Sequence, residues 1–406
     1  MLGLGQLRDR DRVLLVEAGR LHSSIAFTRG STATYMNGAG QIITAAANVP
    51  RFEYSAAGVY LGLLMEESRT NLVLQSQTLG NASWLTNSVS ATVSATTFGG
   101  IAYYAVAKTD TNSSKALSQS VASVVNGTIQ TLTFACRAGS STQMGFGLNG
   151  SSTAWGGSSG TTVAIVSGPG TLTQVSGNLG LCNVTGLSTT VDTVISMTRT
   201  YTTSETSRVY FYPDTSSSVV SGASNLVTRV QIEAAASYTS YIPTTTATVT
   251  RSADSAVITP LSKITYNSSE GTFVTIVNQG VYASTQQTYF CLNDNTTNNR
   301  NQVRRETKTT VTLALIVTGG TTQASYSQTA GNDNTLVKAA AHYKASDSAG
   351  SANGLTASSG SPATLPVVDR LHIGHNTGGN ILNGWIKYLA YYPRARLAVE
   401  LKALSS

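Results

Sequence analysis

Apolar and polar residues alternate along much of this chain, in short runs that turn residues separate. The clearest of these runs are at residues 131–136, 208–212, 271–277, 311–317 and 385–392. Successive side chains of a β-strand point to opposite faces, so this period of two predicts half-buried strands. Asn-Gly and Gly-Gly pairs between the runs predict tight turns. This pattern predicts an all-β chain built as a sandwich or jelly roll.

Helical patterns are confined to two short stretches. Residues 11–19 fit a helical turn or a strand equally well. After Pro393, Leu397, Leu401 and Leu404 recur at the i, i+4, i+7 spacing of one helix face. The fold prediction is therefore two antiparallel β-sandwich (jelly-roll) domains after a short N-terminal leader, with a short C-terminal helix.

The clearest domain boundary is the polar run at residues 240–254, which contains Pro243. Extended, polar, proline-containing segments are typical of connections between domains. A softer boundary lies at residues 74–82. These boundaries divide the chain into a leader at 1–75, a first β-domain at 76–250 and a second at 256–406.

Composition favours self-assembly over binding to a polyanion. Charged residues make up 11% of the chain, against about 25% in an ordinary globular protein. Copies of so weakly charged a surface repel one another little. The formal net charge is +7, but the basic residues are scattered. We therefore expect ordinary solvated surface and no nucleic-acid binding.

The cysteines and the N-terminus bear on where the chain is made. Cys136, Cys182 and Cys291 are far apart and form no CxxC motif, which predicts buried free thiols and no zinc site. The charged run at residues 8–12 precedes any apolar core of a signal peptide. No apolar run approaches the ~20 residues of a membrane span. We expect synthesis in a cytoplasm, without membrane insertion.

Motifs for catalysis or metal binding are sparse. His372 and His375 are three positions apart, so they would point to opposite faces of a strand, which disfavours joint metal ligation. Glycoside hydrolysis needs two carboxyls ~5–10 Å apart. The acids of the second domain each stand alone in sequence: Glu270, Asp294, Glu306, Asp333, Asp347, Asp369 and Glu400. Two loops hold calcium-type donors, Asp294–Asn295 with Asn298–Asn299, and Asp333–Asn334. Ordinary Asn-rich turns are the preferred interpretation, and no cofactor or catalytic residue is expected.

Sugar binding is the main non-catalytic hypothesis, because aromatic faces pack on sugar rings. Trp155 lies in the Gly-rich segment 154–157 and is the candidate glycan-binding residue. Trp84 and Trp385 are expected in the cores of their domains.

The N-terminal segment resembles the leader of tail-associated and head-associated structural proteins of tailed bacteriophages. The resemblance rests on residues 27–35 (FTRGSTATY), 48–54 (NVPRFEY) and 62–72 (GLLMEESRTNL). It implies a docking segment on the virion, with a set of candidate residues: Phe27, Arg29, Tyr35, Arg51, Glu66, Glu67 and Arg69.

Two further patterns resemble domains of such virion proteins. The run 230–233 (VQIE), followed by 240–244 (SYIPT), resembles the end of carbohydrate-binding-module-like jelly rolls. Residues 270–273 (EGTF), 369–374 (DRLHIG) and 382–393 (LNGWIKYLAYYP) resemble a concanavalin A-like, or laminin G-like, sandwich.

The resemblance implies a non-enzymatic virion structural protein, made in the host bacterial cytoplasm. A tail fibre or spike component that attaches to host-surface polysaccharide is the first expectation. A capsid-decoration or head-fibre protein is the alternative, and a polysaccharide depolymerase is a third class. The expected partners are further copies of the chain, most simply as a homotrimer, and other tail or capsid proteins.

Overall fold

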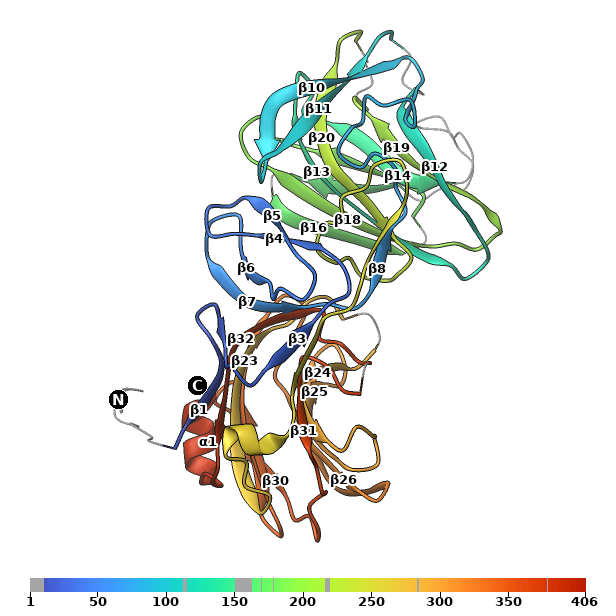
Figure 1. Cartoon of the computed structure of the whole chain (residues 1–406). Helices are drawn as coiled ribbons and strands as arrows, with labels where there is room; N and C mark the ends of the chain where they lie inside the picture. The colour runs from blue at the N-terminus through green and yellow to red at the C-terminus, as the bar shows by residue number, and fades with distance from the viewer. Residues whose placement is uncertain are drawn as a thin grey trace. The chain divides into compact units, whose positions relative to one another are not determined.

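The structure is a computed structural model of the chain, and it describes residues 11–111, 115–149, 163–168, 170–177, 179–215, 220–282, 285–377 and 379–406. Strands dominate the described residues, and helix is confined to η1 (Leu261–Ile264) and α1 (Ala398–Leu404) (Figure 1). The all-β prediction is confirmed. The chain forms two compact bodies: the middle body is Arg69–Arg251, and the terminal body combines the residues up to Ser68 with Ser252–Ser406.

The middle body is a sandwich of two six-stranded sheets. The first runs in the order β10 (Val89–Phe98), β11 (Ile101–Lys108), β20 (Ser224–Glu233), β13 (Ile129–Ala138), β18 (Thr193–Thr200), β16 (Gly170–Gly177). The second runs β15 (Val163–Ser167), β17 (Leu181–Thr185), β14 (Met144–Asn149), β19 (Glu205–Tyr212), β12 (Leu117–Val124), β9 (Leu85–Thr86). A separate ladder pairs β8 (Arg69–Asn71) with β21 (Val249–Arg251).

Aromatic side chains join the two sheets of the middle body. The ring of Phe134, from β13, lies 5.0 Å from the rings of both Phe146 and Phe211, which belong to the other sheet. The alternation along β13 places Leu132, Phe134 and Cys136 in this core. The sequence pattern predicts antiparallel sheets, but two edge pairs, β15 with β17 and β16 with β18, are parallel.

The terminal body pairs a nine-stranded sheet with a seven-stranded one. The nine-stranded sheet runs β2 (Arg20–Leu21), β1 (Val13–Glu17), β32 (Gly384–Tyr392), β23 (Glu270–Asn278), β28 (Leu336–Lys344), β29 (Ser348–Ala352), β30 (Ser358–Gly360), with β7 (Tyr60–Met65) on β32 and β6 (Phe52–Tyr54) on β7. The seven-stranded sheet runs β27 (Thr321–Thr329), β26 (Thr310–Thr318), β25 (Arg300–Arg305), β24 (Gln287–Asn293), β31 (Arg370–Ile373), β22 (Ser255–Ile258), β3 (Ala26–Thr28). The rings of Phe273 and Phe290 stack between the sheets, with their centroids 4.5 Å apart. A hairpin of β4 (Ala33–Met36) and β5 (Ile42–Ala45) is separate.

Strands from the N-terminal segment are built into the sheets of the terminal body. Strands β1 and β7 both pair with β32, and β3 pairs with β22, so this blue segment lies against the red end of the chain (Figure 1). The reason is burial, because Leu15, Val16 and Leu63 are fully enclosed only within that core. The leader that the sequence sets apart is therefore divided: its residues up to Ser68 share one core with residues 252–406, whereas Val73 lies in the core of the middle body. The chain crosses between bodies at Ser68–Arg69 and Arg251–Ser252.

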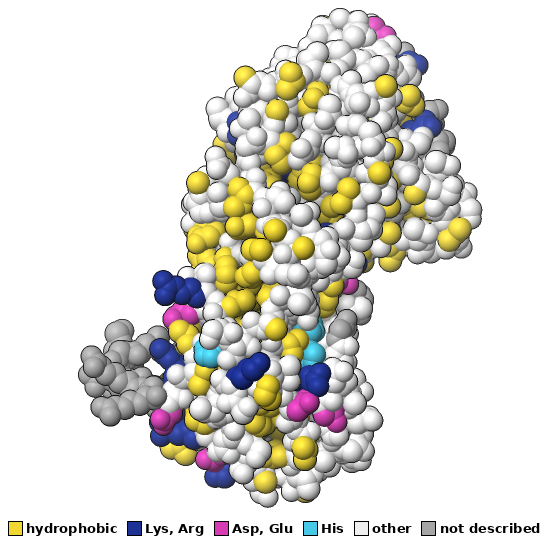
Figure 2. Space-filling view, in the orientation of Figure 1, with side chains coloured by type: hydrophobic (Ala, Val, Ile, Leu, Met, Phe, Trp, Pro, Cys, Tyr) yellow, Lys and Arg dark blue, Asp and Glu magenta, His cyan; other side chains and the backbone are white. Residues whose placement is uncertain are grey.

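The C-terminal helix and the cysteines follow the sequence prediction, with one difference. Helix α1 buries Leu401 against the outer face of the nine-stranded sheet, but Leu397 precedes the helix and is 69% exposed. The three cysteines are free and buried, which confirms the prediction of unpaired internal thiols. On the face shown in Figure 2, most of the surface is uncharged. In the described part of the chain, no helix is both long and apolar enough to span a membrane.

Candidate functional site

The charged residues of the N-terminal segment meet in a buried ion cluster of the terminal body. Asp254 stands at its centre, with Oδ1 3.2 Å from Arg29 Nη1 and Oδ2 2.7 Å from Arg51 Nη2. Arg51 also lies 2.8 Å from Glu66 Oε2, and the backbone N–H of Glu66 donates to Asp254 Oδ2 at 2.9 Å. The side chains of Arg29, Arg51 and Asp254 are wholly enclosed. These groups therefore hold the N-terminal strands in place.

A further carboxyl lies beside this cluster. Glu53 accepts hydrogen bonds from the indole N–H of Trp385 (2.9 Å) and the backbone N–H of Met36 (3.3 Å). Part of the residue reaches solvent, but its carboxyl is enclosed by protein atoms. Burial, aided by the negative charge of Glu66, raises the pKa of Glu53 to about 7.

The other predicted docking residues have varied surroundings. Phe27 packs on the core of the terminal body, and Tyr35 is half-buried in the β4–β5 hairpin. Glu67 is tied to Asn383, whose amide donates to Glu67 Oε1 at 2.7 Å. Arg69 belongs to the middle body, 4.0 Å from Glu233. Docking to a virion stays a prediction for the segment, whereas the buried charges of Arg29 and Arg51 have partners within the chain.

Sequence reasoning missed Asp254, the residue that completes the ion cluster. It lies in the polar run 240–254, where it looks like part of a linker. Its partners Arg29 and Arg51 are 225 and 203 positions away. The one sequence feature that points to a buried ion pair here is the isolated acidic residue at the end of this otherwise uncharged or basic run.

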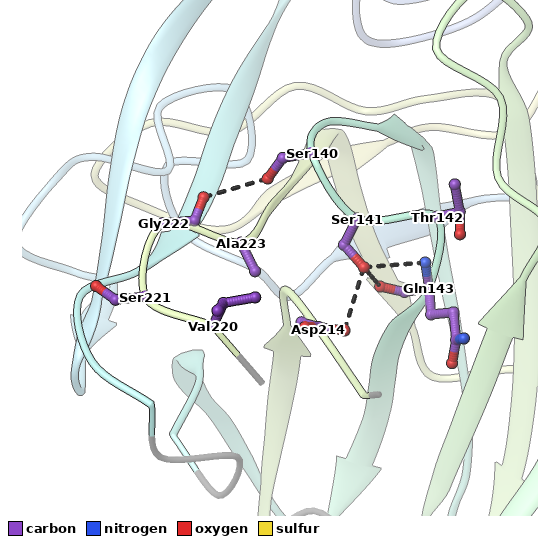
Figure 3. A pocket seen from close by; sticks show the side chains of 9 residues that line it. All are labelled: Ser140, Ser141, Thr142, Gln143, Asp214, Val220, Ser221, Gly222 and Ala223. Carbon is purple, nitrogen blue, oxygen red and sulfur yellow. Dashed lines mark hydrogen bonds between the residues drawn. The ribbon is translucent and has the colours of Figure 1, made fainter. Parts of the chain in front are cut away.

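An open pocket lies at one end of the middle body (Figure 3). The turn between β13 and β14 forms one side, and Asp214 with residues 220–223, which lie between β19 and β20 in the chain, form the other. Its volume is about 520 Å³, and its lining is mostly polar: Ser140, Ser141, Thr142, Gln143, Asp214, Val220, Ser221, Gly222 and Ala223. Hydroxyls, backbone carbonyls and one carboxylate thus converge beside two small apolar side chains.

Hydrogen bonds fix the two sides of the pocket to one another. Ser141 Oγ donates to the carbonyl of Gln143 or to Asp214 Oδ1, at 3.0 and 3.2 Å (Figure 3). The buried amide of Asn225 donates to the carbonyls of Gln143 and Pro213, and so braces both loops from below. The pocket is therefore preorganised, which lowers the entropic cost of binding.

A buried lysine lies behind the pocket. The backbone N–H of Gly222 donates to the carbonyl of Lys108 at 2.9 Å, and Lys108 is only 2% exposed. Burial lowers the pKa of Lys108, and the negative charges of Asp110 and Asp214 oppose that shift. Lys108 Nζ donates to the carbonyl of Lys115 at 2.6 Å, and its positive charge is attracted by Asp214 on the pocket lining.

The three tryptophans do not meet at this pocket. Trp155, the candidate glycan-binding residue, lies outside the described residues. Trp84 is buried in the core of the middle body and donates to the carbonyl of Gln75. Trp385 is half-buried in β32, with its indole on Glu53.

The two neighbouring histidines contradict the expectation of opposite faces. Strand β31 ends at Ile373, and Gly374 has a φ of +74°, so the chain turns before His375. The rings of His372 and His375 meet edge to face at 4.7 Å. Burial, with the neighbouring His375, lowers the pKa of His372 to about 4. In the described residues, no three His, Cys, Asp or Glu side chains are grouped as metal ligands.

The acids of the second domain have separate partners. The calcium-type loops are closed internally, since Asp294 accepts from Thr296 and Asn299, and Asp333 pairs with Arg305. The remaining ion pairs are Glu270–Lys344, Glu306–Arg304, Asp369–Arg370 and Glu400–Arg396, with Asp347 beside His342.

Comparison with known proteins yields structural likenesses only. No protein-family model and no curated protein matches the chain. A Ruminococcus gnavus sialidase CBM40 domain bound to α2,3-sialyllactose is 14% identical, with a TM-score of 0.29 over 36% of this chain and 91% of that one. A SAP-like pentraxin from Limulus polyphemus is 10% identical (TM-score 0.26; 34% and 70% covered). The binding domain of botulinum neurotoxin DC is 9% identical, with a TM-score of 0.29 over 38% of this chain and 39% of that one. Likenesses this weak establish neither a family nor a ligand.

Proposed function

We propose that the protein is a non-enzymatic structural component of a tailed-bacteriophage particle that binds a host-surface glycan. The observation that carries the glycan proposal is the preorganised pocket of the middle body, with Asp214 and serine hydroxyls on its lining. A carboxylate and hydroxyls pair with sugar hydroxyls in both hydrogen-bonding directions. Val220, which is 63% exposed, offers an apolar contact for the C–H face of the sugar.

The virion role rests on the order of the three sequence patterns that resemble phage proteins. The low charge supports assembly of several copies, which we propose to be a homotrimer. Several copies on one particle would raise a weak affinity for each site to useful avidity.

The carboxylate positions support a binding role over hydrolysis. Asp214 is the one acid among the residues that line the described pocket. A glycosidase needs a second carboxyl across the scissile bond. We therefore expect no release of reducing ends when the full chain is incubated with host polysaccharide, and measurable release would overturn the non-enzymatic proposal.

The glycan proposal is tested with the purified full chain on immobilised neutral mono- and oligosaccharides. Asp214→Asn keeps the shape of the side chain but removes its charge, and Ser141→Ala removes a pocket hydroxyl. We expect each to weaken binding about tenfold, as the loss of a charge-assisted hydrogen bond does. Glu205→Gln is the matched control, because Glu205 lies at the other end of β19, roughly 20 Å from the pocket at the rise of a strand. Equal binding by all variants would contradict the site assignment.

Location in the particle is a separate test. Antibody labelling of intact virions is expected to mark the tail. Labelling of every capsomer would instead support the capsid-decoration alternative and contradict the attachment-fibre role.

A further inference from the structure

A second cleft, in the terminal body, combines aromatic, apolar and cationic side chains. It lies on the outer face of the nine-stranded sheet, beside the end of helix α1, and has a volume of about 260 Å³. Its lining residues are Arg12, Val274, Ile276, Lys338, Tyr388, Tyr392, Leu404 and Ser406.

The sheet register explains why these side chains meet. Tyr388 on β32 is directly opposite Ile276 on β23, and Ile276 is opposite Lys338 on β28. Side chains in one such row share a face and lie about 5 Å apart. Leu404, from the helix, closes the row from above by packing on the same outer-face cluster. The cleft thus has an apolar floor, a tyrosine wall and a cation at each side.

The polar groups that face this cleft are mainly hydrogen-bond donors. Arg12 Nη1 lies 3.4 Å from the hydroxyl of Tyr388, and Lys338 Nζ donates to the main-chain oxygen of Ser406, an acceptor on the lining, at 2.6 Å. A lysine has three donors and an arginine five, so most remain for a ligand. Burial raises the pKa of Tyr388 to about 12, which keeps its phenol protonated. Among the described residues, neither Arg12 nor Lys338 forms an ion pair with an Asp or Glu carboxylate, although Glu17, at the end of the strand that follows Arg12, attracts Arg12.

We propose that this cleft binds a carboxylated sugar residue, such as a hexuronate or a sialate, independently of the pocket in the middle body. The carboxylate would accept a charge-assisted hydrogen bond from Lys338 at one end of the row, with Arg12 at the other end of the ring. The C–H face of the ring would pack on Tyr388 and Ile276, a use of apolar surface that an inorganic anion does not make. The volume is just below the range of drug-sized ligand pockets, which suits a single sugar ring.

The test is calorimetric titration of the full chain with four probes: glucuronate, N-acetylneuraminate, glucose and acetate. We expect an acidic sugar to bind more tightly than glucose and acetate, and to weaken as salt increases. Lys338→Gln and Tyr388→Ala are each expected to weaken it about tenfold. The matched control is Lys344→Gln, because Lys344 is an exposed lysine on the same strand whose partner is Glu270.

Four outcomes would overturn the proposal. Glucose binding as tightly as the acidic sugars would remove the role of charge, and acetate binding equally would remove the role of the ring. Acidic-sugar binding that survives both Lys338→Gln and Tyr388→Ala would place the site elsewhere. Asp214→Asn is expected to leave acidic-sugar binding intact, and its loss in that variant would show that the ligand occupies the middle-body pocket instead.

Discussion

Substituting Asp254 tests whether the buried ion cluster holds the N-terminal strands on the terminal body. Asp254→Asn is nearly isosteric, so it removes charge without opening a cavity. In the native protein the carboxylate lies 3.2 Å from Arg29 and 2.7 Å from Arg51, and all three side chains are fully enclosed. The variant would leave the Arg29 guanidinium without its carboxylate and the Arg51 guanidinium with Glu66 as its acidic neighbour.

The size of the effect follows from the burial of both arginines. Removing one partner of a buried ion pair costs about 3–5 kcal/mol. The remaining contact of Arg51 with Glu66, at 2.8 Å, places the expectation at the lower end, about 3 kcal/mol. With a urea m-value of about 1–3 kcal/mol per M, the midpoint would fall by roughly 1–3 M.

The assay is urea unfolding followed by tryptophan fluorescence. Trp385 is the one tryptophan of the terminal body's sequence, so Trp84 and Trp155 are replaced with phenylalanine in every variant compared. Asp369→Asn is the control, because Asp369 forms an exposed pair with Arg370 that is worth at most about 1 kcal/mol. A midpoint for Asp254→Asn within error of the control's would refute the reasoning.

Three further predictions concern pH, packing and reactivity. Burial raises the pKa of Glu53 to about 7, above its ordinary 4.5, so between these pH values the folded protein keeps a proton that the unfolded chain releases. The stability of the terminal body is therefore expected to fall as pH rises from about 4.5 to 7. In denaturation series at several pH values, Glu53→Gln should remove this part of the dependence of the unfolding free energy on pH. Gly62→Ala lowers the melting temperature, because φ is +139° and a Cβ would lie 2.6 Å from the backbone of Ile386; a change within 1 °C would contradict this. The native chain is expected to show no thiol reactive towards Ellman's reagent, because all three cysteines are buried and burial raises the pKa of Cys136 and of Cys291, the latter to about 12. Urea should expose three reactive thiols, and a thiol that reacts before unfolding would contradict this.

The alternating runs determined the strands because they are a local property. The run at 271–277 became β23 and the run at 385–392 became β32, since a period of two offers one apolar face to any partner sheet. The same runs also indicated the fold class and the buried cysteines. Nothing local states that Val274 faces Ala390 or that β1 and β7 both pair with β32.

The candidate sites depended on the tertiary structure. Asp214 and Ser141 are 73 positions apart and meet because two loops lie at one end of a sandwich. In the sequence, Asp254 looks like part of a linker. Folding brings it to Arg51, 203 positions away, and the buried ion pair then connects the two segments. His375 does not point to the opposite face from His372, because the strand ends at Ile373, two residues before His375. Sequence determined which segments are strands and which faces are apolar, whereas long-range pairing decided which charged and polar groups meet, since such contacts leave no periodic signal in the chain.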